Sequence, residues 1–281
     1  MTDLASQGLT PAGGDVLENP VDPSSARASQ GAPGRRRHRL PPARGLLPLV
    51  VVLVIWQLAG DRNSPFFPPP STWLDALRTL SDGGQLWPAV GASAELFGLS
   101  ILIATVIGAV LGIVMGSTRP ADRALGPTTE FLRALPAAAL VPILVLVLGS
   151  SATTELVIVV LGTLWPVLLS TRDAMRTMNP LYADVARTLH LTRMGRLRKV
   201  TIPALFPALL LGVQVMAPTT LIVVILVELL TGLSGIGAQL ATAQQSFLSA
   251  AVYGLVVVAA LMAFILNLLL IGLERPAERY R

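Results

Sequence analysis

Residues 97–116 read Phe-Gly-Leu-Ser-Ile-Leu-Ile-Ala-Thr-Val-Ile-Gly-Ala-Val-Leu-Gly-Ile-Val-Met-Gly, a stretch without a single charged side chain. An α-helix rises about 1.5 Å per residue, so a run of this length can cross a hydrocarbon core of roughly 30 Å. Ala250–Leu273 is a second such run. Of the 281 residues, 53% are hydrophobic and 13% are charged, which is about half the charged fraction of an ordinary soluble domain. These patterns predict an all-α membrane protein with several spans.

Six transmembrane spans are expected along the chain. The third and fourth are short and are joined at Gly149-Ser150-Ser151, which predicts a single apolar hairpin. Residues 1–44, rich in Gly, Pro, Ser and Ala, have no periodic apolar face and are expected to form a disordered cytoplasmic tail. A transmembrane domain over 45–273 and a C-terminal tail over 274–281 complete the expected organisation. The expected spans are Gly45–Gly60, Val90–Gly116, Leu135–Leu148, Glu155–Ser170, Ala204–Leu230 and Ser249–Leu273.

The basic residues indicate the orientation of these spans. With the N-terminus inside, every one of the 21 Lys and Arg residues except Arg62 and Arg78 falls in an inner segment. Inner segments of membrane proteins carry the excess of Lys and Arg, so both termini are predicted to be cytoplasmic. The same rule explains the net charge of +5. The basic residues are therefore expected to face membrane lipid, and no nucleic-acid partner is expected.

The first outer segment contains three consecutive prolines within Phe66–Pro70. Each proline restricts its own φ and disfavours helix in the residue before it, so this stretch is expected to be rigid and extended. Ser71 is then predicted to cap a short interfacial helix. Its apolar residues recur at helical spacing and are Trp73, Leu74, Leu77 and Leu80.

Two features inside the spans are candidates for packing or gating. Gly108, Gly112 and Gly116 recur every four residues, so the backbone of another helix could approach this stripe closely. The pattern favours static packing over a sliding surface. Pro136 and Pro142 interrupt the third span, and such breaks can free backbone carbonyls toward a cavity. They are candidates for a pathway or gate.

The acidic side chains near the spans do not form a catalytic arrangement. Glu95, Glu155 and Glu228 come near the outer ends of spans, where a carboxylate is expected to reach water, and Glu228 is a further candidate for the pathway. No cluster resembles a proton relay or an acid–base pair. The chain has no cysteine, and its two histidines, His38 and His190, lie in separate segments. No catalytic residue, metal site or bound cofactor is therefore expected.

The inner loop Thr171–Pro203 is the most informative polar segment. Asn179-Pro180 is a favourable helix start, with Asn as N-cap and Pro at the first helical position. A helix over Leu181–Leu191 would place Asp184 and Arg187 three residues apart, close enough to pair. A second short, basic amphipathic segment follows it. On charge alone, a solvated loop lying on anionic headgroups is the alternative.

Within Tyr182–Pro203, Asp184-Val185-Ala186 is followed after three residues by His190, and after nine more by Val200-Thr201-Ile202-Pro203. This segment resembles the cytoplasmic signature of bacterial binding-protein-dependent ABC transporter permeases. That signature reads Glu-Ala-Ala, three residues, Gly, nine residues, then Ile-x-Leu-Pro. The spacing matches throughout. His190 replaces a glycine that permits a turn between two short helices.

The resemblance covers most of the chain from about Phe66 onward and extends to the sulfonate, taurine and nitrate permeases. Phe67–Ser71 is similar to their Leu-Pro-x-Pro-like stretch, and Leu132–Pro136 to their Leu-Arg-x-x-Pro segment. Their Glu followed by Gly-x-Gly resembles Glu228 with Gly232, Gly235 and Gly237.

The resemblance implies a type I ABC importer permease in the bacterial cytoplasmic (inner) membrane, which passes a small solute such as a sulfonate, taurine or nitrate. Coupling helices between spans four and five would dock on a separate cytoplasmic ATPase, which binds the ATP and Mg. An extracytoplasmic solute-binding protein and a second permease copy, forming a homodimer, are the other implied partners. The implied coupling residues are Asp184, Ala186, Arg187, Leu189, His190, Arg193, Met194, Leu197 and Pro203.

Two other functions compete with this interpretation. An ATP-independent channel or secondary transporter would need membrane-embedded ion-coupling residues. The scarcity of central charges argues against proton coupling, whereas Na⁺ sites built from backbone carbonyls stay open. A membrane-bound enzyme would need converging acid, base, metal or nucleophile residues, and the sequence shows no such set.

Overall fold

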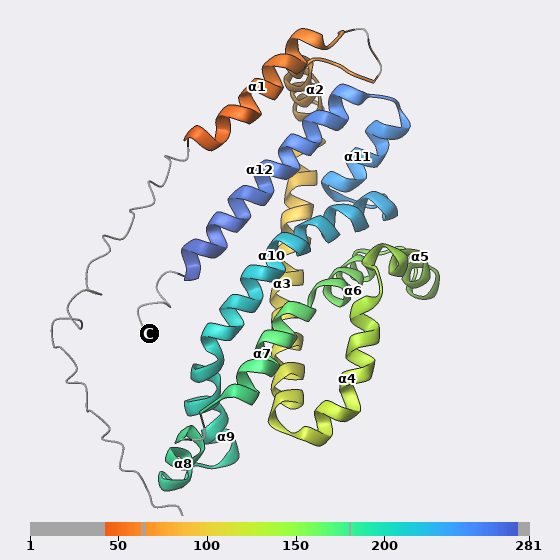
Figure 1. The fold of residues 1–281 in the computed structure, drawn as a ribbon. Coiled ribbons are helices and arrows are strands. Elements are labelled where there is room, and N and C mark those ends of the chain that lie inside the picture. The colour runs from red at the N-terminus through yellow and green to blue at the C-terminus, as the bar shows by residue number, and fades with distance from the viewer. Residues whose placement is uncertain (1–42, 63, 65, 180, 275–281) are drawn as a thin grey trace, which may run out of the picture. The chain divides into compact units, whose positions relative to one another are not determined.

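The structure is a computed structural model that describes residues 43–62, 64, 66–179 and 181–274. The chain divides into two units, Met1–Leu49 and Val50–Arg281, and the second holds all the helices from α2 onward. The expected tails lie outside the described residues, apart from residues 43, 44 and 274. Every regular element in the described part is helical (Figure 1). In chain order these are α1 (Ala43–Ala59), α2 (Pro70–Asp82), α3 (Leu86–Ser117), α4 (Arg119–Ala134), α5 (Ala137–Leu148), α6 (Ala152–Thr163), α7 (Trp165–Thr177), α8 (Leu181–Thr188), α9 (Arg193–Arg196), a π-helical turn (Leu197–Thr201), α10 (Ile202–Thr231), α11 (Gly235–Gln245) and α12 (Ser249–Glu274).

Three helices of the described chain are long and apolar enough to cross a membrane, and they comprise Leu86–Ser117, Met194–Thr231 and Ser249–Leu270. The pairs α4–α5 and α6–α7 are bent, and counting each pair as one span raises the total to five. The first expected span corresponds to α1, whose apolar part, Leu47–Ala59, would extend only about 20 Å as a helix. The described residues therefore confirm the all-α class. They provide three to five spans and a shorter apolar helix where six spans were expected.

The expected hairpin of the third and fourth spans is present as α5 and α6, but each helix is sharply bent from its neighbour. α4 and α5 meet at 97°, where Leu135 is extended and Pro136 precedes α5. Proline disfavours helix in the residue before it, so the break falls at Leu135. α6 and α7 meet at 43° around Leu164, two residues before Pro166. The single expected span Glu155–Ser170 is consequently divided between two helices.

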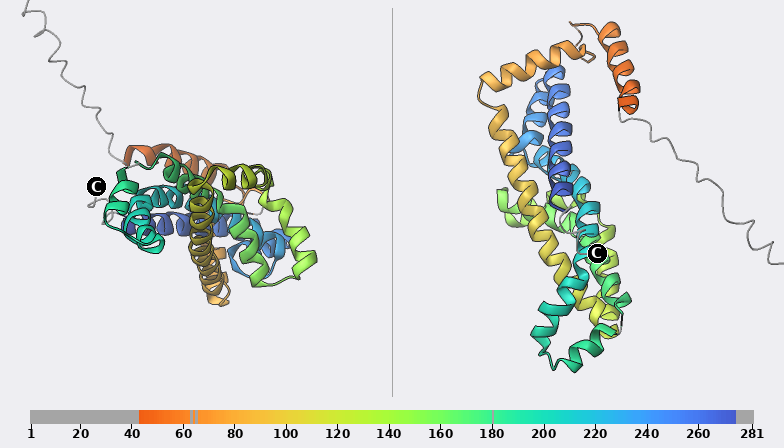
Figure 2. Two further views of the ribbon diagram at one scale, coloured as in Figure 1. Left: turned by 90° about the horizontal axis from the view of Figure 1, so that it is seen from below. Right: turned by 90° about the vertical axis from the view of Figure 1, so that its left-hand side faces the viewer.

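α7 packs against α3 (Figure 2), and the glycine stripe of α3 lies in this contact. A Cβ atom placed on Gly108 would lie 3.0 Å from the carbonyl oxygen of Leu164. One placed on Gly112 would lie 2.7 Å from the carbonyl oxygen of Leu168, and Gly116 is equally crowded by α7. Because glycine has no side chain, the backbones of α3 and α7 can approach this closely.

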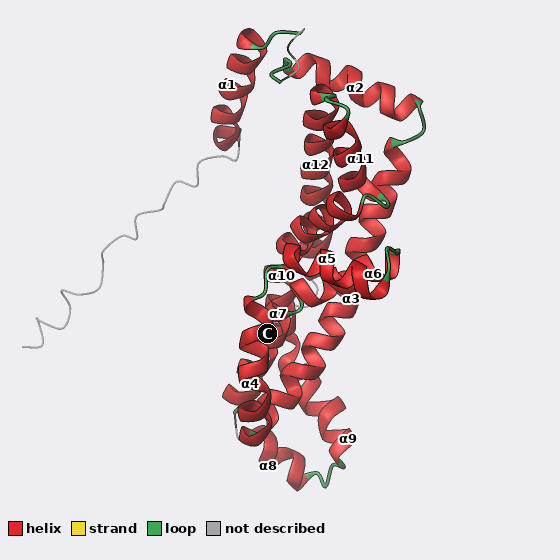
Figure 3. Ribbon diagram, turned by 90° about the vertical axis from the view of Figure 1, so that its right-hand side faces the viewer, coloured by secondary structure: helices red, strands yellow, loops and turns green. Residues whose placement is uncertain are grey.

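The ends of α1, α2 and α12 meet in an aromatic cluster. Trp56 stacks on Phe67 with ring centroids 4.7 Å apart, and it lies edge-on to Trp73 and Tyr253. The hydroxyl of Tyr253 donates a hydrogen bond to the carbonyl oxygen of Phe66 at 3.1 Å. The helix expected after the prolines is thus present as α2. It lies at the end of its unit opposite α8 and α9 (Figure 3).

Ser71 does not cap α2 as expected. The helix begins at Pro70, Pro69 occupies the N-cap position, and no side chain accepts a hydrogen bond there. Proline suits the first helical turn because its φ is helical and it has no N–H to satisfy, so the start moves earlier. Ser71 instead donates its N–H to Gln57 Oε1 at 3.0 Å, and its hydroxyl accepts from Gln57 Nε2 at 3.1 Å.

Candidate functional site

The segment that carries the signature lies at one end of its unit, whereas α2 and α11 lie at the other (Figure 1). Its first helix, α8, begins at Leu181, whose N–H donates to the Asn179 side-chain oxygen at 2.9 Å. This is the capping role expected of Asn179, while Pro180 lies outside the described residues. α8 ends at Thr188, three residues before the expected end at Leu191.

His190 forms the turn that ends α8. Its φ is 47°, in the left-handed region. The His190 N–H donates to the Arg187 carbonyl oxygen at 2.9 Å, and the Leu191 N–H donates to the Ala186 carbonyl oxygen at 3.1 Å. These two bonds make a Schellman motif, which satisfies carbonyls that a helix end leaves free. Glycine is the usual residue at this position, and His adopts it more readily than most other residues. The histidine therefore makes the turn that the signature glycine would make.

The exposed side chains of α8 include an apolar stripe. Leu181, Tyr182, Val185 and Leu189 are 62%, 48%, 43% and 62% exposed. With 3.6 residues per turn, these four positions fall within about 100° of the helix circumference. Ala186, next to the stripe, is buried at 3% exposure. Large apolar side chains gathered on a polar segment indicate an interaction surface.

The second basic segment runs directly into α10. α9, the π-helical turn and α10 follow one another without a gap, so this segment is the beginning of a long helix. Met194 is 62% exposed and is a further accessible apolar side chain of this segment, whereas Leu197 is only partly exposed. The side chain of Arg193 lies outside the described residues. Pro203 closely follows the π-helical turn within this long helix, and its missing N–H removes one bond from the helical ladder there.

Asp184 and Arg187 form the expected pair across one turn of α8. Arg187 Nη1 lies 3.3 Å from Asp184 Oδ1, and both side chains are exposed. An exposed pair of this kind stabilises a helix by only about 0.2–1 kcal/mol. Both charges consequently stay accessible to a partner.

A family model described as "Binding-protein-dependent transport system inner membrane component" matches residues 94–278. The chain belongs to this family. It is the permease subunit of an ATP-binding cassette importer and a multi-pass protein of the inner membrane.

Relatives and a solved structure agree with this assignment. The putative aliphatic sulfonates transport permease protein SsuC of Bacillus subtilis (strain 168) is 26% identical over 261 residues, covering 92% of this chain and 94% of that one. The nitrate import permease protein NrtB of Leptolyngbya laminosa is 28% identical over 79% of this chain and 75% of that one. A chain of the MetNI methionine ABC transporter, solved in inward-facing conformations, matches with a TM-score of 0.60 at 17% identity, covering 70% of the permease and 97% of that chain. The type I importer fold expected from the sequence is confirmed.

Two carboxylates of the permease that were expected to reach water are buried. Glu155 is 2% exposed, and the hydroxyl of Thr231 donates to its Oε1. Glu228 is 1% exposed, and its Oε2 accepts from the Ser93 hydroxyl at 2.8 Å and from the Gly237 N–H at 3.0 Å. The expectation was wrong because nearness to the end of a span does not reveal which other helices cover a side chain.

Sequence reasoning missed Asp122, in the first turn of α4. Its carboxylate pairs with Arg172 and Arg176 on α7. An acidic residue in the first turn of a helix is favourable by itself, so the local pattern gave no reason to look for a distant partner.

Pro136 precedes α5 and Pro142 lies within it, so both pathway candidates of the third span belong to the bent α4–α5 pair.

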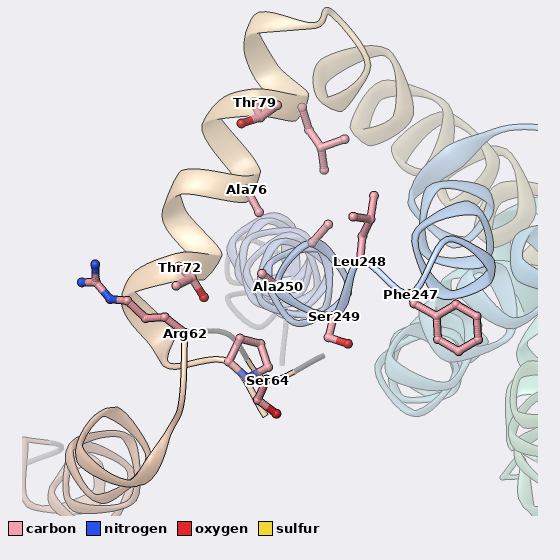
Figure 4. A pocket seen from close by; sticks show the side chains of 12 residues that line it. Arg62, Ser64, Thr72, Ala76, Thr79, Phe247, Leu248, Ser249 and Ala250 are labelled. Atoms are coloured by element: carbon pink, nitrogen blue, oxygen red, sulfur yellow. The ribbon is translucent and has the colours of Figure 1, made fainter. Parts of the chain in front are cut away.

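A cavity of about 390 Å³ lies between α2 and the turn from α11 to α12 (Figure 4). Its lining includes the side chains of Thr72, Thr79, Ser249 and Phe247. Arg62 borders it, and in Figure 4 its side chain extends away from Ser249. The described residues that line this cavity include no carboxylate, so it offers hydroxyl groups and apolar surface without an acid–base pair.

Proposed function

We propose that α8 and the beginning of α9 are the docking surface of the permease for a separate cytoplasmic ATPase. The supporting observation is the apolar stripe at 181, 182, 185 and 189 together with Met194, all exposed on a segment that also carries Arg196, Arg198 and Lys199. The charges keep this segment out of the hydrocarbon core, so its apolar side chains need a protein partner rather than lipid tails. On this proposal both termini are cytoplasmic, in agreement with the distribution of basic residues.

Movement of the docked ATPase would reach the transmembrane helices through α7. α7 leads into α8 through only three residues, Met178–Pro180, and it is in close backbone contact with α3 at Gly108, Gly112 and Gly116. A displacement of α8 would therefore be transmitted to α3 as rigid-body motion between two states. The permease supplies a gated path and no covalent chemistry. ATP and Mg belong to the ATPase, and no cofactor is assigned to this chain.

The remaining partners follow from the same proposal. A solute-binding protein would deliver solute at the opposite end, where the segments after Gly60 and after Leu230 lie. A second, identical permease would complete the path as a homodimer in the lipid bilayer. The names of the relatives favour a small anion, of the sulfonate or nitrate kind, as the solute. Uptake of labelled sulfonate, taurine and nitrate by cells with and without the permease tests this class.

The docking proposal is tested by purifying the tagged permease from its native membrane and identifying the chains that accompany it by mass spectrometry. A P-loop ATPase is expected with the wild type and is expected to be lost from Leu189→Asp, which places a charge in the apolar stripe. Leu233→Asp is the matched control, because Leu233 is also exposed (44%) but follows α10 at the other end of its unit. Retention of the ATPase by Leu189→Asp, or its equal loss from both variants, contradicts the proposal.

A further inference from the structure

Glu228 connects three helices of the permease at the end opposite α8. It belongs to α10, and its Oε2 accepts hydrogen bonds from Ser93 on α3 and from the N–H of Gly237 on α11. The Ser93 hydroxyl in turn accepts from the N–H of Ile236 at 2.9 Å. Two of the N–H groups that the first turn of α11 leaves free are therefore satisfied by side chains from other helices.

Burial of a carboxylate is costly unless its charge is compensated. Here the compensation comes from the amino end of α11, where the helix dipole favours a negative charge and where Gly237 donates directly. Ser93 is 0% exposed and Glu228 is 1% exposed, so water does not compete for these bonds. The contact is consequently specific to one position of α11.

The glycines of the Glu-then-Gly-x-Gly pattern make room for this contact. A Cβ atom on Gly235 would overlap the Glu228 carboxyl group, and Gly235 also has a φ of 90°. A Cβ atom on Gly237 would lie 2.7 Å from the backbone N of Leu229. Any other residue at either position would push α11 away from α10.

We propose that Glu228 and Ser93 are positioning residues that seat the amino end of α11 on α3 and α10. The last turn of α11 exposes the uncharged polar side chains of Thr242, Gln244 and Gln245. The contact of the amino end of α11 with Ser93 and Glu228 determines where these side chains lie in the permease. Productive transport then depends on Glu228 through the position of α11, without Glu228 touching the solute. Only the expected effect on transport rests on the proposed function, whereas the position of α11 does not.

The position of α11 can be measured directly, because the chain contains no cysteine to interfere with labelling. Spin labels attached at Gly91→Cys on α3 and Gln244→Cys on α11, both exposed positions, report the distance between these helices. We expect one narrow distance distribution in the otherwise wild-type protein and a shifted, broader one in Ser93→Ala and Glu228→Ala. Glu228→Gln keeps one acceptor oxygen but places an amide N–H₂ group at the position of Oε1, which has no hydrogen-bond partner in the wild type, so the distance distribution of this variant should be intermediate.

Thr220→Val is the matched control. Thr220 is also 0% exposed, but its hydroxyl donates only within α10, to the carbonyl oxygen of Met216 at 2.9 Å. We expect Thr220→Val to keep the wild-type distance. Ser93→Ala should lower the amount of solute transported per ATP hydrolysed about tenfold in an assembled complex, because it leaves the buried N–H of Ile236 without its acceptor. Wild-type distances in both Ser93→Ala and Glu228→Ala, or an equal change in Thr220→Val, would overturn the inference. Should Glu228→Ala not fold, Ser93→Ala alone decides. Absence of an ATPase partner would refute the proposed function and leave the distance measurement valid.

Discussion

Asp122 on α4 and Arg172 on α7, fifty positions apart in sequence, form an ion pair in which Arg172 Nε donates to Asp122 Oδ1 at 2.5 Å. Arg176, one turn further along α7, pairs with the other carboxylate oxygen. Asp122 lies in the polar first turn of α4, before the apolar part of the α4–α5 pair. The hydrogen bond from Arg172 holds the pKa of this carboxyl below its usual range. The pair joins the start of α4 to the helix that leads into the coupling segment.

Asp122→Asn is expected to lower the melting temperature of the detergent-solubilised permease at neutral pH, because two guanidinium groups lose their counter-charge. Because the pKa of Asp122 is lower in the folded state, the ion pair stabilises the fold fully above the unfolded-state pKa of about 3.9. This stabilisation is lost as the pH falls through the folded-state pKa. The difference between wild type and variant should therefore be constant from about pH 8 to about pH 6 and close only below about pH 4. Asp75→Asn, which removes an exposed pair with Arg78, is the control and should change little. A difference that shrinks between pH 8 and pH 6 would contradict this account.

Gly112→Ala is expected to destabilise the permease by about 1–3 kcal/mol, the usual cost of inserting atoms into a packed contact. The added Cβ would lie 2.7 Å from both the Leu168 carbonyl oxygen and the Thr171 Cβ. Gly98→Ala on the same helix is the control, because nothing lies within 4 Å of a Cβ placed there. Thermal unfolding of both variants in detergent measures the difference, and equal stability of the two would refute the close packing of α3 and α7.

His190→Gly is expected to preserve α8, because glycine adopts the left-handed conformation without the roughly 1–2 kcal/mol that other residues incur. His190→Val, with a β-branched side chain, should loosen the end of the helix. Hydrogen exchange of the α8 amides measures both effects, with exchange about tenfold faster in the valine variant. Faster exchange in His190→Gly than in wild type would mean that the imidazole itself holds the turn.

Asp184→Trp is expected to uncouple ATP hydrolysis from uptake, because a bulky side chain would block docking of α8. Asp184→Ala removes the exposed pair with Arg187 without adding bulk, so it should cost less than about 1 kcal/mol and retain transport. Ala186→Leu should also uncouple, but Ala186 is buried, so its effect would combine docking with the packing of α8 itself. Comparison of solute uptake with ATP hydrolysis in reconstituted vesicles distinguishes these cases, and normal coupled transport by Asp184→Trp would refute the docking surface.

Local patterns predicted some elements well and others poorly. The apolar runs located α3, α10 and α12, and the spacing of Asp184, His190 and Pro203 indicated two short helices separated by a turn. Ser71 was misplaced as a cap because a preceding proline can begin a helix as well as a serine can cap one. Pro166 indicates a break in the fourth span, but a proline within an apolar run does not specify how far the backbone bends, so the 43° angle at Leu164 could not be predicted from it.

The sequence by itself determined that this protein lies in a lipid bilayer and to which family it belongs. Hydrophobic run length, charge bias and motif spacing are local along the chain and independent of packing. Only the tertiary structure decided that Glu228 is buried against Ser93 and Gly237, that Asp122 meets Arg172, and which helix lies against the glycine stripe. These contacts join residues from 9 to 135 positions apart. Their existence depends on how the helices bend and pack, because a side chain is buried by its neighbours in space and not by its neighbours in sequence.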